Sequence, residues 1–223
     1  MSARTIIRMA AAVVCLLTCA SAPALAQKRY QLETTVGGIW MGGYSLGSLD
    51  ANLIANQAGG GPYTLFKTSS SVGSTGGLDA RLGWRASRIF TVEGGLTWSR
   101  PQLSTRLFSD VEGAADVTAT EKTSQYIIEG AVLASLARPG RAITPFVRAG
   151  VGYLRELHDG NSLVQTGTSL HVGGGATFWF GAVARQAIGL RVDGRYYMLH
   201  NGLNLGKTNR SMGALSGSVV FGF

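Results

Sequence analysis

Residues Ala187 to Met198, AIGLRVDGRYYM, alternate between two faces with a period of two. One face carries Ile188, Leu190, Val192, Tyr196 and Met198, and the other carries Arg191, Asp193 and Arg195. Successive side chains of a β-strand point to opposite sides of the sheet, so this stretch is typical of a strand between an apolar and a charged environment. A strand of a soluble sheet with one solvent-exposed face would show the same alternation. The rest of the sequence is therefore needed to distinguish a soluble sheet from a membrane-embedded one.

Residues 1–26 have the features of a Sec signal peptide. Arg4 and Arg8 give a basic start, an apolar run of twelve residues follows, and small residues favour cleavage after Ala26. The apolar run is too short for a membrane-spanning helix, which needs roughly 20 residues. We therefore expect an exported mature chain, residues 27–223, that forms a single domain.

Both cysteines, Cys15 and Cys19, lie in this leader. Lipidation of Cys19 is an alternative, although Thr18 is a poor residue directly before a lipidated cysteine. A mature chain that begins after Ala26 has no cysteine, which excludes disulfides, thiol catalysis and cysteine-ligated metals. We expect no cofactor, because the Gly-Val-Gly at 150–152 lacks the third glycine of a dinucleotide-binding loop and lies inside an expected strand.

The alternation recurs in eight stretches of the mature chain. They are 30–43, 75–86, 88–100, 124–137, 144–156, 167–181, 186–199 and 211–223. The connections after the second, fourth and sixth stretches are short, whereas the other four are longer. Short turns on one rim and long loops on the other are typical of outer-membrane barrels, in which closure satisfies every backbone group. We predict an all-β fold, an eight-stranded antiparallel up-and-down transmembrane β-barrel with short periplasmic turns and long extracellular loops.

Aromatic residues collect at both ends of these stretches, where their rings favour the membrane interface. The chain ends in Val219-Val220-Phe221-Gly222-Phe223. In this pattern it resembles the small eight-stranded bacterial outer-membrane barrels of the OmpA, OmpX and opacity-protein type, over the whole mature chain. The resemblance implies a location in the bacterial outer membrane, and it implies that the barrel-assembly machinery reads the C-terminal Phe223 as an assembly signal.

Ten ionisable residues fall on the inward face of the expected barrel. They are Glu33, Asp79, Arg81, Glu93, Glu129, Arg148, His171, Arg191, Asp193 and Arg195. The interior of an eight-stranded barrel is just filled by side chains, and unpaired buried charges are costly. We therefore predict a network of ion pairs that closes the lumen. The alternatives are a narrow channel for ions, protons or small solutes, a gated pore, and a catalytic acid–base pair.

The excess of basic residues over acidic ones is concentrated in a few parts of the sequence. Of its 20 Lys and Arg, two precede the cleavage site, which leaves 18 against 12 Asp and Glu. Seven of these cations lie at the mature N-terminus or in short connections: Lys28, Arg29, Arg85, Arg88, Arg138, Arg141 and Arg185. This predicts a basic ring, without acids beside it, that faces anionic headgroups at the periplasmic rim. The charge does not follow a groove with stacking aromatics, so nucleic acid is not an expected partner.

Recognition by such a barrel would take place on its outer loops. In the first long loop, residues 49–57 could form a short helix over the barrel mouth. In the second, residues 103–108 and 117–120 could continue two strands beyond the membrane, and an exposed strand edge can bind another protein by strand addition. Arg155 faces outward and is placed to contact a lipopolysaccharide phosphate.

A lipid-modifying enzyme, similar to the lipid A deacylases, is the main alternative function. His158 and His200 lie at outer strand ends, with Ser162, Ser169 or Ser211 as candidate nucleophiles. The spacing does not match the His-x-Ser pattern of the deacylases, and solvated loop histidines are the simpler interpretation. We predict a monomeric, non-enzymatic barrel for surface recognition, adhesion, defence or envelope integrity. Its expected partners are outer-membrane lipids, lipopolysaccharide, the assembly machinery and host or cell-surface ligands.

Overall fold

The computed structural model describes residues 31–53, 63–137, 141–158, 163–183, 186–202 and 209–223. These residues form β-strands and the connections between them. Within this part of the chain, no helix is long and apolar enough to cross a membrane.

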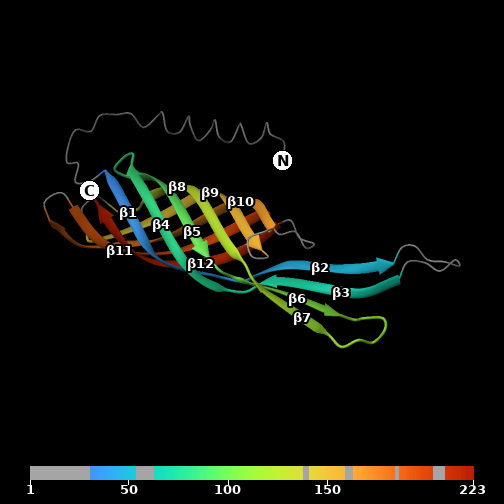
Figure 1. The fold of residues 1–223 in the computed structure, drawn as a ribbon. Coiled ribbons are helices and arrows are strands. Elements are labelled where there is room, and N and C mark those ends of the chain that lie inside the picture. The colour runs from blue at the N-terminus through green and yellow to red at the C-terminus, as the bar shows by residue number, and fades with distance from the viewer. Residues whose placement is uncertain (1–30, 54–62, 138–140, 159–162, 184–185, 203–208) are drawn as a thin grey trace, which may run out of the picture.

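Eight strands close into an antiparallel barrel in the order β1-β12-β11-β10-β9-β8-β5-β4 (Figure 1). They are β1 (Leu32–Met41), β4 (Thr75–Arg85), β5 (Phe90–Ser99), β8 (Ser124–Ser135), β9 (Ile143–His158), β10 (Leu163–Val183), β11 (Gln186–Asn201) and β12 (Asn209–Gly222). The predicted fold is confirmed, and every predicted strand boundary lies within four residues of the observed one. Burial alternates without interruption along β12, because one face of the strand lies against the lumen and the other faces the membrane.

Phe223 extends the pairing between β1 and β12 that closes the barrel. The Phe223 amide donates to the Leu32 carbonyl over 2.9 Å, and the Leu32 amide donates to the Phe223 carbonyl over the same distance. The Phe223 side chain itself is 48% exposed on the outer surface. Its backbone therefore takes part in the pairing between β1 and β12, while its ring is exposed on the membrane-facing surface of the barrel.

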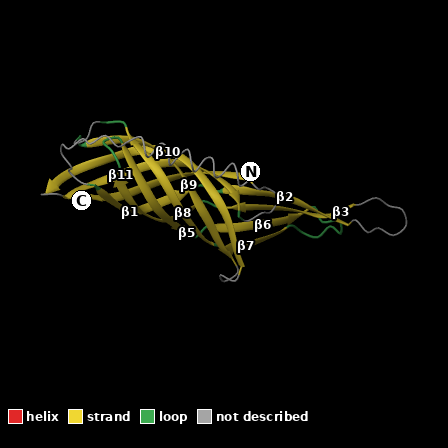
Figure 2. Cartoon of the chain, turned by 90° about the horizontal axis from the view of Figure 1, so that it is seen from above, coloured by secondary structure: helices red, strands yellow, loops and turns green. Residues whose placement is uncertain are grey.

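A second sheet of four strands prolongs one half of the barrel. It is made of β2 (Tyr44–Leu53), β3 (Tyr63–Val72), β6 (Gln102–Phe108) and β7 (Val117–Lys122), in the order β2-β3-β6-β7. The barrel strands β1, β4, β5 and β8 are neighbours in the same order, so each of these four strands is followed or preceded in the chain by its own extension strand. Both views show this sheet projecting from the barrel, at the end opposite the C-terminus (Figures 1 and 2).

The extension corrects one prediction and confirms another. Residues 49–53 belong to β2 rather than to a helix, because their backbone pairs with β3; residues 54–57 lie outside the described residues. The apolar spacing that suggested a helix is therefore overridden by pairing with a strand distant in sequence. The two flanks of the second long loop form β6 and β7, as predicted.

We expect the Phe223 side chain to be needed for assembly of the barrel in the membrane rather than for the stability of the assembled barrel. In Phe223→Ala the backbone bonds to Leu32 are retained, yet assembled protein should fall severalfold, whereas Phe223→Tyr should assemble like the wild type. Heat-modifiable migration of outer-membrane fractions on gels measures the assembled share. Normal assembly of the alanine variant would show that the C-terminal ring is not a signal.

Candidate functional site

The ten predicted lumen residues all lie inside the barrel and are at most 4% exposed. They come from seven of the eight barrel strands, and β12 adds Ser216 and Ser218. Their close approach follows from the alternation of side chains along each strand, which sends every second residue into the same narrow interior.

Arg81 connects three carboxylates at the centre of the lumen. Its Nε lies 2.7 Å from Asp79, and its two terminal nitrogens lie 2.9 Å from Glu129 and 3.7 Å from Glu93. The carboxylates come from β4, β8 and β5, so this one guanidinium ties three neighbouring strands. A group buried to this extent is stabilised only while those partners remain in place.

Arg195 and Arg148 extend the network to the opposite wall. Arg195 lies 2.5 Å from Asp193 on its own strand and 2.9 Å from Asp79 across the lumen. Arg148 lies 3.2 Å from Glu129, which also accepts a hydrogen bond from the Tyr197 hydroxyl over 2.9 Å. The ion pairs therefore span the lumen from wall to wall and leave the central section filled.

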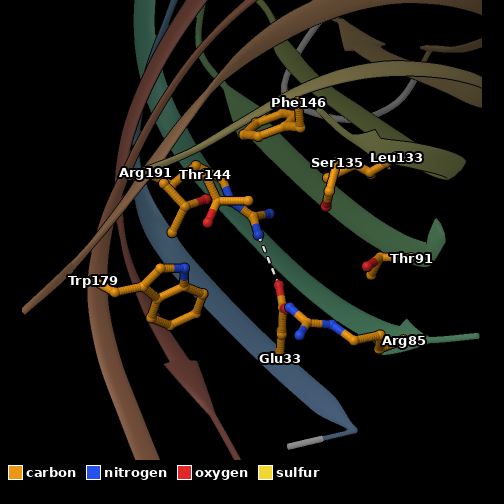
Figure 3. Close-up of a pocket in the computed structure, with 10 residues that line it drawn as sticks. Glu33, Arg85, Thr91, Leu133, Ser135, Thr144, Phe146, Trp179 and Arg191 are labelled. Atoms are coloured by element: carbon orange, nitrogen blue, oxygen red, sulfur yellow. Dashed lines mark hydrogen bonds and ion pairs between the residues drawn. The ribbon is translucent and has the colours of Figure 1, made fainter. Parts of the chain in front are cut away.

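A smaller group of charged side chains lies at the periplasmic mouth of the lumen (Figure 3). Arg191 lies 2.9 Å from Glu33 and 2.5 Å from Glu93, and Figure 3 shows Glu33 reaching toward Arg191 with Arg85 beside it. Arg85 lies 2.7 Å from Glu33. The cavity between these side chains measures about 20 Å³, which is room for about one water molecule.

This contact corrects the predicted basic ring, in which Arg85 was expected to have no acid beside it. Arg85 pairs with Glu33, so it belongs to the lumen network. With Arg85, five guanidinium groups face the five carboxylates of Glu33, Asp79, Glu93, Glu129 and Asp193. Arg88 and Arg141 are exposed, as a rim would require, and the other four residues of the ring lie outside the described residues.

Inward glycines make room for these long side chains. A Cβ on Gly95 would lie 3.2 Å from Glu129 and 3.3 Å from Arg81, and one on Gly150 would lie 2.5 Å from the His171 ring. The lumen is therefore packed closely enough that even a methyl group would displace the network.

The outer half of the lumen holds an apolar plug beside buried polar side chains such as Glu156, His158 and Arg210, and the sequence did not lead us to expect this plug. Buried side chains of the barrel meet others from the base of the extension. They are Ile39, Met41, Ile127, Leu154, Tyr197, Leu199, Met212 and Ala214 in the barrel, with Tyr44, Leu46 and Val72 in the extension. The strand alternation already placed Met41 and Leu199 on the inward face, so the same signal could have revealed this plug.

A polar contact fixes the extension to the barrel. The Tyr44 hydroxyl on β2 donates to the Glu156 carboxylate on β9 over 3.0 Å, and the Arg210 guanidinium lies 5.3 Å from the Tyr44 ring. Burial, and after it the charge of Glu156, raises the pKa of the Tyr44 hydroxyl, so this group keeps the proton that it donates. The base of the extension is therefore held in one orientation over the barrel.

The candidate catalytic residues of the outer rim do not form one cluster. His158 is buried and lies 3.0 Å from the Thr123 hydroxyl, so its prediction as a solvated histidine is wrong. Ser169 is buried inside the barrel, and Ser162 lies outside the described residues. His200 and Ser211 remain on the outer surface.

The other outer-rim predictions concern bound ions. Arg155 is exposed on β9, where a phosphate could reach it. Among the described residues, no three His, Asp or Glu side chains gather closely enough to hold a metal ion.

The two edges of the extracellular sheet differ. Edge strand β2 is interrupted by register shifts at Ser45/Gly47 and Ala51/Asn52, and Gly47 has φ 110°. Edge strand β7 pairs with β6 in unbroken register, and all of its residues are exposed. Bulges hinder the pairing of an edge strand with another chain. The edge at β2 is therefore protected from such pairing, whereas the edge at β7 is available for it.

A family model, described as the outer membrane protein beta-barrel domain, matches residues 12–215 of the sequence. The chain belongs to this family. It is a β-barrel protein of the bacterial outer membrane.

The chain is similar at low sequence identity to solved structures of other outer-membrane proteins, and neisserial surface protein A shares its fold. Neisserial surface protein A is 15% identical, with 86% of this chain and 97% of that chain covered and a TM-score of 0.55. OprG from Pseudomonas aeruginosa is 13% identical, with 86% and 94% covered and a TM-score of 0.49. Ail of Yersinia pestis, solved with the heparin analogue sucrose octasulfate, is 13% identical, with 86% and 99% covered and a TM-score of 0.43. No curated protein sequence matches significantly.

Removing one lumen cation should destabilise this outer-membrane barrel strongly. Arg81→Met leaves Asp79 and Glu129 without their shared partner, and the loss of one side of a buried ion pair costs about 3–5 kcal/mol. Arg155→Met, on the exposed surface, is the control and should leave stability unchanged. Urea unfolding in phospholipid vesicles, followed by tryptophan fluorescence, gives both free energies. Equal stabilities would mean that the network contributes nothing to the fold.

Proposed function

We propose that this protein is a closed, non-enzymatic barrel that anchors an extracellular recognition sheet. The observation that carries the proposal is the four-stranded extension, which continues half of the barrel wall beyond the membrane. A barrel needs no such sheet for its own closure, because its eight strands already pair in a ring. The sheet is therefore available for contacts with molecules outside the cell.

The packing of the lumen argues against a channel. Along its length, an ion-paired mouth is followed by the charged centre and then by the apolar plug. An ion crossing this interior would have to separate buried pairs such as Arg195–Asp79, which is costly, and then displace the closely packed side chains of the outer half.

Strand β7 is the part of the sheet best suited to bind a partner. The Thr123 amide donates to the Pro101 carbonyl, which identifies residues 123 and 101 as a hydrogen-bonded pair. Because such pairs alternate along an antiparallel ladder, the amides of Thr118 and Thr120 point away from β6. Among the described residues no strand lies on that side of β7, so these amides can pair with an extended segment of another protein.

Proline at these two positions tests strand addition without breaking the sheet. In the double variant Thr118→Pro/Thr120→Pro the outward amides are lost while the bonds to β6 remain. We expect adherence of a non-adherent strain that expresses the protein, measured on fibronectin- and laminin-coated surfaces, to fall at least tenfold.

The matched control is Thr118→Val/Thr120→Val, which keeps both amides and a β-branched shape and should adhere like the wild type. Adherence that survives the proline variant, or that the valine variant also loses, would rule out recognition by the β7 backbone. Wild-type protein that confers no adherence would overturn the recognition function itself on these surfaces.

A lipid-modifying enzyme is a second candidate, favoured by one observation on the outer rim. The His200 Nδ1 lies 2.5 Å from the Asn209 Oδ1, and Ser211 follows two residues later on the same exposed face of β12. A histidine oriented by a third group, near a hydroxyl, is the arrangement that activates a serine nucleophile.

Our proposal predicts that this group is not catalytic. Mass spectrometry of lipid A and phospholipids should give the same profile for cells with the wild type, with His200→Ala and without the protein. A new acylation state that requires both His200 and Ser211 would establish an enzyme and overturn the non-enzymatic assignment.

A further inference from the structure

The membrane-facing surface of the barrel has a shallow, open hollow near its outer end. It spans the four neighbouring strands β1, β12, β11 and β10, and its larger lining side chains are Trp40, Val172, Tyr196 and Leu215. All four are exposed. The hollow is open toward the membrane, and its lining is that of a membrane surface.

Two outward-facing glycines form the floor of the hollow. A Cβ on Gly213 would meet no atom within 4 Å, and one on Gly194 would meet only the Leu215 side chain, at 3.4 Å. The space above both glycines is therefore open toward the membrane, and a side chain at Gly213 would fill it without clashing with the barrel.

The depth of the hollow follows from the geometry of β12. Phe223 lies at the periplasmic end of the outer surface, ten residues from Gly213. At about 3.3 Å per residue and a strand tilt of about 40°, those ten residues rise roughly 25 Å, which is about the height of the apolar band of such barrels. The hollow therefore lies at the outer boundary of that band, beside the acyl chains of the outer leaflet.

The surface becomes polar directly above the hollow. Ser211 and Asn209 follow Gly213 toward the outer rim, and His200 is paired in register with Asn209. All three are exposed. A molecule with an apolar chain in the hollow would thus bring its polar head to hydroxyl, amide and imidazole groups.

We propose that this hollow is a binding site for one acyl chain of lipopolysaccharide, with the sugar head of the lipid at Ser211, Asn209 and His200. The outer face of the barrel is its interface with the membrane, and the hollow is continuous with that interface. Lipopolysaccharide is the lipid whose acyl chains occupy the outer leaflet at this depth. Trp40 and Tyr196 flank the chain on either side, as interfacial aromatic residues do.

Filling the hollow tests the site directly. Gly213→Leu places a side chain into it, and the matched control is Gly217→Leu on the same outward face of β12, where a Cβ also meets no atom within 4 Å but which does not line the hollow. Delipidated protein is titrated with rough lipopolysaccharide and, in parallel, with phosphatidylethanolamine, and complexes are counted by native mass spectrometry. Heat-modifiable migration shows that each variant is folded.

We expect one lipopolysaccharide per wild-type barrel, binding at least tenfold weaker in Gly213→Leu, and wild-type binding in Gly217→Leu. Equal binding by all three proteins, or equal loss in both variants, would overturn the site. A preference for phosphatidylethanolamine would overturn the assignment to lipopolysaccharide. A protein dimer that only Gly213→Leu abolishes would show that the hollow holds a second copy of the chain instead.

Discussion

Charge pairing inside a barrel too narrow for bulk water is the constraint on which this structure depends. Five carboxylates and five guanidinium groups form the ion-paired network, and all of them except the partly exposed Arg85 are shielded from solvent that could replace a lost partner. The contacts join strands that are far apart in sequence, such as β1 with β11 through Glu33 and Arg191. The network therefore specifies which strands face each other across the lumen as well as filling it.

The packed lumen has a consequence for the extracellular sheet. The apolar plug of the outer half includes side chains of β2 and β3, and Tyr44 bonds to Glu156 on the opposite half of the barrel. The extension is thus rooted in the same core as the barrel, and a rigid base presents the open β7 edge away from the membrane. A single-layer sheet has little core of its own, so this anchoring is what keeps it ordered.

The strands and the ten lumen residues could be predicted from the sequence. Apolar and charged residues alternate clearly along a strand that has one face against lipid and the other against a charged lumen. Arg85 and His158 were missed, although they continue the inward positions of their strands, because each was assigned to a connection. The strand β2 could not be foreseen in this way. Its two bulges shift the alternation, and its pairing with β3 is a non-local contact that no local pattern encodes.

The closed lumen is the central claim, and planar-bilayer recording of the purified barrel tests it most directly, with a known porin inserted as the positive control. The ion-paired and apolar sections predict no discrete conductance steps over many insertions of folded protein. Reproducible steps whose size changes in Arg195→Ala would contradict the account, because they would show that ions pass through the network described here.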